Sequence, residues 1–204
     1  MWQLKTTDDK EKFRVDFDEL MKINDDTVGW IRFYKEPSQI NYPVVQGEDN
    51  DLYLHKTFSA NENTLGAIFV DAAASSDFTD KNTIIYGHRM KDGSMFRKLE
   101  EYKDKDFWKE NPYFYIYTPD GKEITYKIYS VGQVLDTSDT YLTSFAGEED
   151  YQKFLDMTMK EADYDTGVKV TTDDTIVTLS TCTAASDEHR FVVRGVKEKE
   201  VELQ

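Results

Sequence analysis

The sequence predicts a mainly antiparallel β-barrel with inserted helices. Seven or eight short apolar runs of strand length follow residue 28, and they do not alternate regularly with helices as the strands of a doubly wound sheet do. Two of these runs, 112–117 and 122–135, flank Pro119-Asp120-Gly121, which has the composition of a hairpin turn. The 204 residues suffice for one domain with a substantial core.

Helices are expected where apolar residues recur every three or four positions. The first helix is expected at residues 8–23, where Asp8 and Glu11 resemble a capping box. Its apolar face consists of Phe13, Phe17, Leu20 and Met21. Further helical segments are expected at 49–55, 93–102 and 148–162.

Strands are expected where apolar residues cluster without helical spacing. These segments are 30–33, 41–45, 66–71, 82–86, 112–117, 122–135, 175–181 and 190–196. Pro43 suits an edge position in a sheet, and the charged tail 197–204 is expected to be frayed at its end. We therefore expect a helical segment, residues 1–27, packed on a barrel of residues 28–204, with both parts in a single domain.

The composition disfavours several classes of partner. The net charge is −15, so neither nucleic acid nor an anionic membrane surface is an expected partner. The single cysteine excludes an internal disulfide and a multi-cysteine zinc site. No apolar run approaches the roughly 18 residues that a membrane-spanning helix needs. We expect a cytosolic protein or a soluble piece of a longer one.

Cys182 is the residue with the clearest chemical potential. A lone cysteine with a histidine distant in the sequence is a candidate nucleophile, although a buried structural cysteine is an alternative. Strand alternation places Thr178, Ser180 and Cys182 on one face of the expected strand. That face becomes polar toward the end of the strand, as the wall of a cleft should.

Arg190 and His88 supply the other groups that covalent catalysis requires. On a neighbouring strand, Arg190 could donate two hydrogen bonds to an oxyanion and favour the thiolate, or it could be a rim arginine paired with a carboxylate. His88 ends a strand directly after Gly87, which favours it as the acid or base. His55 is expected at the surface, and His189 on the face opposite Arg190.

Three segments carry a resemblance to a known family: Tyr86-Gly87-His88-Arg89-Met90, Thr178-Leu179-Ser180-Thr181-Cys182 and Arg190-Phe191-Val192-Val193. Together they resemble the sortases of Gram-positive bacteria, specifically class B. Further similarity lies in Gly29-Trp30-Ile31, in residues 41–46 and 66–71, and in a helix at 148–162 before the cysteine strand. The resemblance implies a closed eight-stranded sortase-type β-barrel with an N-terminal helix.

The resemblance also implies a reaction. Cys182 would be the nucleophile, His88 the general acid/base, and Arg190 the stabiliser of the scissile carbonyl and its oxyanion. Such a cysteine transpeptidase cleaves a C-terminal sorting signal after threonine through a thioester and transfers the surface protein to an amine of the peptidoglycan precursor. No metal or cofactor is implied.

The expected substrate is a signal of the Asn-Pro-x-Thr-Asn kind, or a variant beginning with Ser or Pro. Ser180, Thr181 and Arg194 are expected to contact it, with further pocket residues from the 136–165 region. We expect a monomer at the extracellular face of the cell membrane, with an N-terminal transmembrane anchor that this sequence lacks. Alternative functions are a pilin polymerase, a non-catalytic peptide- or wall-binding barrel, and a cysteine protease that only hydrolyses.

Overall fold

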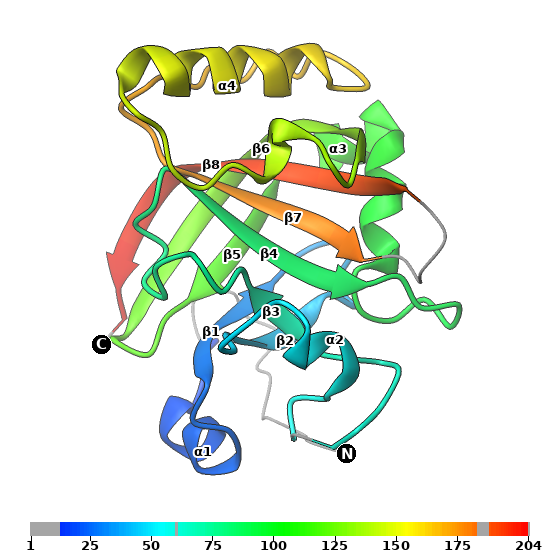
Figure 1. Cartoon of the computed structure of the whole chain (residues 1–204), viewed down its shortest axis with the longest axis vertical. Helices are drawn as coiled ribbons and strands as arrows, with labels where there is room; N and C mark the ends of the chain where they lie inside the picture. The colour runs from blue at the N-terminus through cyan, green and yellow to red at the C-terminus, as the bar shows by residue number, and fades with distance from the viewer. Residues whose placement is uncertain (1–12, 60, 183–187, 204) are drawn as a thin grey trace.

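The strands of the protein form a closed barrel (Figure 1). The computed structural model describes residues 13–59, 61–182 and 188–203, with only the backbone of Cys182. Within this part of the chain the eight strands are β1 (Thr27–Arg32), β2 (Asn41–Val45), β3 (Ile68–Val70), β4 (Asn82–His88), β5 (Tyr113–Tyr117), β6 (Lys122–Leu135), β7 (Ile176–Cys182) and β8 (His189–Glu202).

The barrel order is β1-β2-β3-β4-β7-β8-β6-β5, and pairing of β5 with β1 closes it. The predicted barrel is therefore confirmed. Only the β2–β3 and β4–β7 pairs among the described strands are parallel, and the others are antiparallel. The parallel β4–β7 pair proves central to the candidate site.

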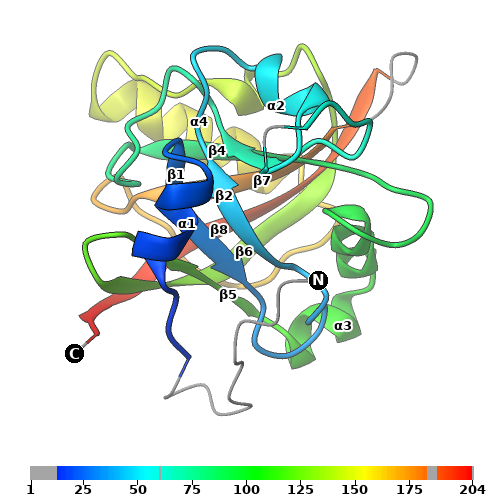
Figure 2. The same ribbon diagram turned by 90° about the horizontal axis from the view of Figure 1, so that it is seen from below.

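Helices lie outside the barrel. In Figure 1, α4 and α1 are at opposite ends of the molecule, and Figure 2 shows α1 against β1. The described helices are α1 (Phe17–Ile23), α2 (Leu52–His55), the 3₁₀ helix η2 (Arg97–Lys103), α3 (Lys105–Glu110), the 3₁₀ helix η3 (Asp139–Tyr141) and α4 (Glu148–Lys160).

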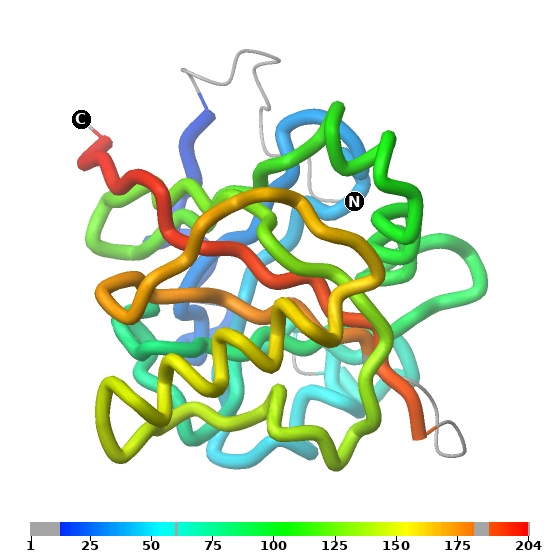
Figure 3. The backbone as a smooth tube through the Cα atoms, turned by 90° about the horizontal axis from the view of Figure 1, so that it is seen from above, coloured from blue at the N-terminus to red at the C-terminus, as the bar shows by residue number. Residues whose placement is uncertain are grey.

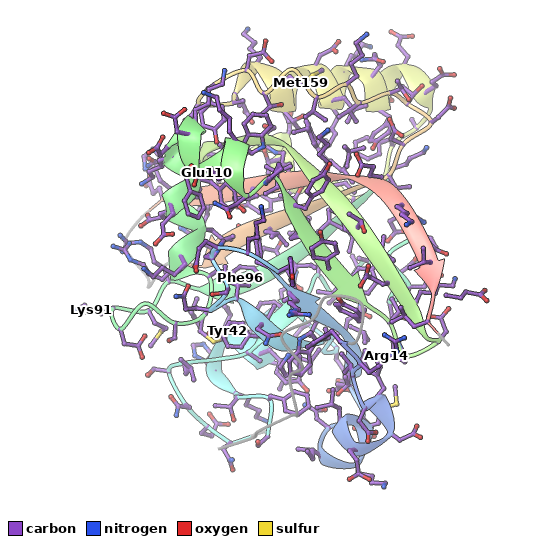
Figure 4. All side chains as sticks on the ribbon, turned by 180° about the vertical axis from the view of Figure 1, so that it is seen from behind. Arg14, Tyr42, Lys91, Phe96, Glu110 and Met159 are labelled. Carbon is purple, nitrogen blue, oxygen red and sulfur yellow. The ribbon has the colours of Figure 1, made fainter. Side chains whose placement is uncertain are left out.

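Apolar side chains from the inner faces of the strands fill the barrel. On β7 and β8 the alternation predicted from the sequence is confirmed, since Val177, Leu179 and Val193 belong to the main core. Phe96 enters this core from the segment after β4 and is fully buried, whereas Lys91 in the same segment is exposed (Figure 4). The outer face of β7 and β8 does not contribute to this core and is available to contact segments outside the barrel.

Helix α4 covers part of that outer face (Figure 3). Tyr151, Phe154 and Leu155 are buried against Ile176 and Val196 of the two strands. Each such side chain contributes about 1.5–3 kcal/mol by leaving water. Three acidic residues open the helix, where the positive end of the helix dipole favours them. The helix predicted at 148–162 is confirmed.

The amino-terminal helix is shorter than predicted. It begins at Phe17, because Asp16 caps it by accepting a hydrogen bond from the Glu19 N–H at 3.0 Å. Phe13 precedes the helix and is buried against Trp30 and Tyr117. The predicted capping box of Asp8 and Glu11 lies outside the described residues.

The tail is more ordered than expected, because β8 continues to Glu202 and residues 197–202 pair with the start of β6. Pro43 lies in β2 between β1 and β3, but β3 pairs only with Val44 and Val45. Pro43 therefore has a ladder partner on the β1 side alone among the described strands, as its expected edge position requires. Helix α3, capped by Asp104, was not expected from the sequence.

Gly195 allows two aromatic rings of the core to stack. The rings of Phe114 and Tyr126 lie 5.1 Å apart at 9°, and a Cβ added at Gly195 would be 2.5 Å from Phe114 Cε1. We predict that Gly195→Ala lowers the free energy of unfolding by about 1–3 kcal/mol through overpacking. Chemical denaturation with an unchanged m-value would measure this.

Gly147→Ala is the matched control for Gly195→Ala. An added Cβ at Gly147 meets no atom within 4 Å, and the backbone there is extended. As an N-cap substitution it should cost less than about 1 kcal/mol. Equal losses in the two variants would contradict the packing explanation.

Candidate active site

The ends of three strands bring the predicted catalytic residues together. The parallel β4–β7 register places His88 opposite Cys182. On the other side of β7, Ser180 lies opposite Val192 of the antiparallel strand β8. Continuing that register by two residues places Arg190 opposite Cys182. The Phe191 N–H, which donates to Thr181 Oγ1 at 3.0 Å, keeps the two strands together at this point.

We call the position that His88, Cys182 and Arg190 share in this register the cysteine row. Residues directly opposite each other in paired strands project to the same side. Because Val177 and Leu179 of β7 and Val193 of β8 face the core, alternation places Ser180, His88 and Arg190 on the outer face of the sheet. The side chain of Cys182 and residues 183–187 are outside the described part of the structure.

The imidazole of His88 is held by the backbone of α2. Its Nε2 atom lies 2.7 Å from the carbonyl oxygen of Leu54. A carbonyl oxygen only accepts hydrogen bonds, so Nε2 carries the hydrogen and Nδ1 is the basic nitrogen of the neutral ring. The contact thus assigns the tautomer of the candidate acid/base.

Gly66 packs directly against this ring. Its φ is +62°, and an added Cβ would lie 2.6 Å from His88 Cδ2 and 2.7 Å from the Tyr53 carbonyl oxygen. Glycine is therefore required here both for the left-handed backbone and for the close approach.

Helix α2 is itself anchored by Tyr53. The Tyr53 hydroxyl donates to Asp26 Oδ2 at 2.6 Å and accepts from Asn24 Nδ2 at 2.9 Å. Burial, followed by the hydrogen bond to Asp26, raises the pKa of Tyr53 to about 12. Tyr53 consequently remains a hydrogen-bond donor at neutral pH and holds the helix that carries the Leu54 carbonyl.

Arg190 contacts two groups in the described part of the chain. Its Nη1 donates to the His189 carbonyl oxygen at 3.0 Å, and its Nη2 lies 3.6 Å from Asp136 Oδ2. The carboxylate partner foreseen in the rim-arginine alternative is therefore present. The side chain is 19% exposed, so the guanidinium remains accessible at the edge of the barrel.

Ser180 lies on the same face, one row below Cys182 and opposite Tyr86. Its Oγ is 2.9 Å from the Tyr141 hydroxyl, and the Tyr141 ring stacks on Tyr86 at 6.1 Å. Ser180 is 1% exposed, because Tyr141 covers it. Two stacked tyrosines therefore lie next to the cysteine row, and one of them, Tyr141, covers the buried Ser180.

A small polar pocket adjoins the row. It has a volume of about 210 Å³, and Arg190 and Thr181 line it together with Arg89, Glu100 and Lys103. Arg89 Nε and Glu100 Oε1 form an ion pair at 3.0 Å across this region. Among the described residues that line this pocket, cationic side chains outnumber acidic ones.

Comparison with known proteins agrees with this geometry. The family model described as a sortase domain matches residues 36–198. Sortase B of Listeria monocytogenes is 38% identical over 194 residues, which cover 93% of this chain and 77% of the relative. The chain belongs to the class B sortases. Sortases are cysteine transpeptidases that anchor surface proteins, and they are cell-surface enzymes.

Solved sortase B structures share the fold over most of their length. A Staphylococcus aureus sortase B–substrate complex matches with a TM-score of 0.84 and 34% identity, covering 90% of this chain and 84% of that one. A sortase B complexed with triglycine matches with a TM-score of 0.82 and 34% identity, covering 92% and 86%. No described helix of the present sortase is long and apolar enough to cross a membrane.

All three residues expected to contact the substrate are buried in this sortase, since Ser180 and Thr181 are 1% exposed and Arg194 is 0% exposed. The hydroxyl of Thr181 accepts a hydrogen bond from the Phe191 N–H, and Thr181 also lines the polar pocket beside Arg190. Arg194 shares the outer face with Arg190 but is 0% exposed beneath the connection between β6 and β7. Direct contact of a peptide with Arg194 is not supported.

The three histidines differ in their exposure and in their position relative to the cysteine row. His55 is exposed and lies 3.6 Å from Asp51, and His189 is exposed at the start of β8. Only His88 of the three lies in the cysteine row on the outer face. Sequence reasoning expected pocket residues in the 136–165 region without singling out Tyr141, and it missed the Leu54 carbonyl, because neither group belongs to a motif and both come from connections between strands.

We predict that the neutral ring of His88 is the Nε2–H tautomer and that Gly66→Ala disturbs it. The added Cβ would push the ring from the Leu54 carbonyl. Nitrogen-15 spectra of the histidine side chains should show the Nε2–H pattern for His88 in the wild type and a changed pattern in the variant.

Gly93→Ala is the matched control. Gly93 has φ +89°, so an alanine there has a similar left-handed backbone cost of about 1–2 kcal/mol. Its added Cβ has Lys98 Cε as nearest neighbour, at 3.7 Å, and does not touch His88. An unperturbed His88 signal in Gly66→Ala, or an equal change in Gly93→Ala, would refute the explanation.

Proposed function

We propose that Cys182, His88 and Arg190 carry out the transpeptidation. The observation that supports these roles is the register that aligns His88 and Cys182 on adjacent parallel strands, with Arg190 on the strand that flanks Cys182. A thiol, an imidazole and a guanidinium on one face provide a nucleophile, a proton carrier and an oxyanion donor.

In the first half-reaction the Cys182 thiolate attacks the carbonyl carbon of the threonine in the sorting signal. The carbon–nitrogen bond breaks, and the leaving amine takes a proton from His88. The fork of Arg190 donates two hydrogen bonds to the oxyanion. The thioester product retains the amino-terminal part of the surface protein.

In the second half-reaction an acceptor amine attacks the thioester. His88 takes the proton that this amine loses, and the thiolate leaves as a new amide forms. Since Nε2 of His88 is bonded to the Leu54 carbonyl, Nδ1 is the nitrogen that exchanges this proton. Because the orientation of the ring is fixed, the imidazole is already positioned for proton transfer in both half-reactions.

The proposed substrate is a sorting signal of the Asn-Pro-x-Thr-Asn kind or a variant beginning with Ser or Pro, and the proposed acceptor is an amine of the peptidoglycan precursor. Structures of relatives with a substrate and with triglycine support this pair of ligands. We propose that the enzyme acts as a monomer at the extracellular face of the cell membrane. The pilin-polymerase, non-catalytic and purely hydrolytic alternatives gain no support over wall anchoring.

We predict a thioester on Cys182 that an amine resolves. Mass spectrometry of the protein with an Asn-Pro-Gln-Thr-Asn peptide should show an adduct of the Asn-Pro-Gln-Thr acyl group. Adding triglycine should convert this adduct to a joined peptide, because the amine is a better nucleophile than water. Cys182→Ala should form neither species.

The same measurement tests the alternatives. A panel of peptides beginning with Ser or Pro separates a different sorting signal from an inactive barrel. Joining only to a lysine-bearing peptide would contradict wall anchoring in favour of pilin polymerisation. Cleavage that no amine accelerates would contradict the transpeptidase mechanism.

We predict that Arg190→Lys lowers kcat by about 10²–10³-fold, as loss of an oxyanion donor does. A lysine keeps the charge but cannot donate two parallel hydrogen bonds. The rate of acyl-enzyme formation at saturating peptide would measure the loss. Arg97→Lys is the control, because Arg97 pairs with Glu100 outside the cysteine row and its substitution should leave kcat unchanged. Similar losses in both variants would argue against the role of Arg190.

A further inference from the structure

Arg194 is a buried charge that the proposed reaction does not use. It lies on the outer face of β8, opposite Ser130 of β6 and Thr178 of β7, and is 0% exposed. Thr178 precedes Cys182 by four residues on β7, so Arg194 lies about 13 Å along the strands from the cysteine row. That separation is too great for a direct hydrogen bond to a reacting carbonyl.

The guanidinium of Arg194 joins three elements. Nη1 donates to Ser130 Oγ of β6 at 2.9 Å. Nη2 donates to Thr140 Oγ1 of η3 at 2.6 Å and to Glu161 Oε2, just after α4, at 3.2 Å. Burying an arginine is costly, and these bonds to Nη1 and Nη2 offset part of the cost, although Nε is buried without a hydrogen-bond partner. Glu161 also supplies the opposite charge. The network thus attaches both helical parts of the β6–β7 connection to the barrel.

Thr140 is held from a second side by Asn82 of β4. Asn82 Nδ2 donates to the carbonyl oxygens of Thr140 at 3.2 Å and of Leu142 at 2.8 Å. Asn82 is itself oriented by Thr178, whose Oγ1 donates to Asn82 Oδ1 at 2.8 Å. The hydroxyl of Thr140 is therefore fixed by β8 and its carbonyl by β4.

The residue after Thr140 is Tyr141, which covers Ser180 on the outer face next to the cysteine row. With Thr140 clamped, the Tyr141 hydroxyl reaches Ser180 Oγ at 2.9 Å and its ring stacks on Tyr86. Ser180 is two residues before Cys182 on the same strand face. A shift of η3 would therefore move Tyr141 relative to the cysteine row without moving any of the three proposed catalytic residues.

We propose that Arg194 is a positioning residue for peptide recognition: it clamps Thr140 and thereby sets the place of Tyr141 in the sorting-peptide cleft. The proposal rests on the proposed function, in which the peptide binds along this face. Lysine cannot replace Arg194, because a single ammonium cannot reach Ser130, Thr140 and Glu161 in the same plane.

The test is a comparison of Arg194→Lys with the wild type on the Asn-Pro-Gln-Thr-Asn peptide, or on the member of the panel that the wild type cleaves. KM should rise about tenfold or more, as loss of hydrogen bonds to a charged group would cause, while kcat changes by less than about threefold. The affinity of the peptide for Cys182→Ala should fall by a similar factor when Arg194→Lys is added.

The reactivity of Cys182 toward a small reagent distinguishes a positioning role of Arg194 from a general structural role. The rate at which a methanethiosulfonate modifies Cys182 does not depend on the peptide cleft and should be equal in wild type and Arg194→Lys. Slower modification in proportion to the lost activity would mean general disruption of the site and would overturn the proposal. Unchanged KM in a folded Arg194→Lys protein would also overturn it.

Thr140→Val provides a second variant, which removes the hydroxyl that accepts from Arg194 and donates to Glu161 Oε2 at 3.3 Å. It should raise KM as Arg194→Lys does, and the double variant should be no worse than the more affected single one, since both remove the same contact. If Arg194→Lys does not fold, an unchanged KM in folded Thr140→Val overturns the proposal. A wild type that forms no thioester with any peptide would instead be a failure of the proposed function.

Discussion

The parallel pairing of β4 with β7 is the constraint on which the candidate site depends. Parallel strands end at the same edge of a sheet, so His88 and Cys182 finish their strands side by side. The antiparallel strand β8 starts at that edge and brings Arg190. Three chemically different groups are thus placed by backbone hydrogen bonds of the barrel, without reliance on a long connection.

The inner and outer faces of β7 and β8 have different functions. The inner face packs Val177, Leu179 and Val193 into the main core, which makes the strands rigid. The outer face holds the proposed chemistry at one end and the underside of the β6–β7 connection at the other. At the end of this face that lies away from the cysteine row, aromatic side chains of α4 pack on Ile176 and Val196. Arg194 and Asn82 bind η3 and the residue after it through hydrogen bonds. A class B sortase can therefore vary this connection while the catalytic row stays in place.

Much of this arrangement could be predicted from the sequence because it follows period-two alternation. The shared face of Ser180 and Cys182, and that of Arg190 and Arg194, were predictable from spacing alone. What covers a face is not encoded in spacing, so Arg194 was expected in the cleft although η3 and α4 bury it. The Leu54 carbonyl is a backbone group without a sequence signature. The pairing of β4 with β7 was not predicted either, because spacing within one strand does not specify its neighbour in the barrel.

The β4–β7 pairing also has a consequence for the order of events during folding. It joins residues 82–88 to residues 176–182, so closing it requires the chain between them to be ordered first or looped out at an entropic cost. An emerging chain contains His88 well before Cys182 exists, and the register that aligns the two residues forms only when the barrel closes. Nascent and partly folded forms of the enzyme are therefore expected to be chemically inert toward peptide bonds.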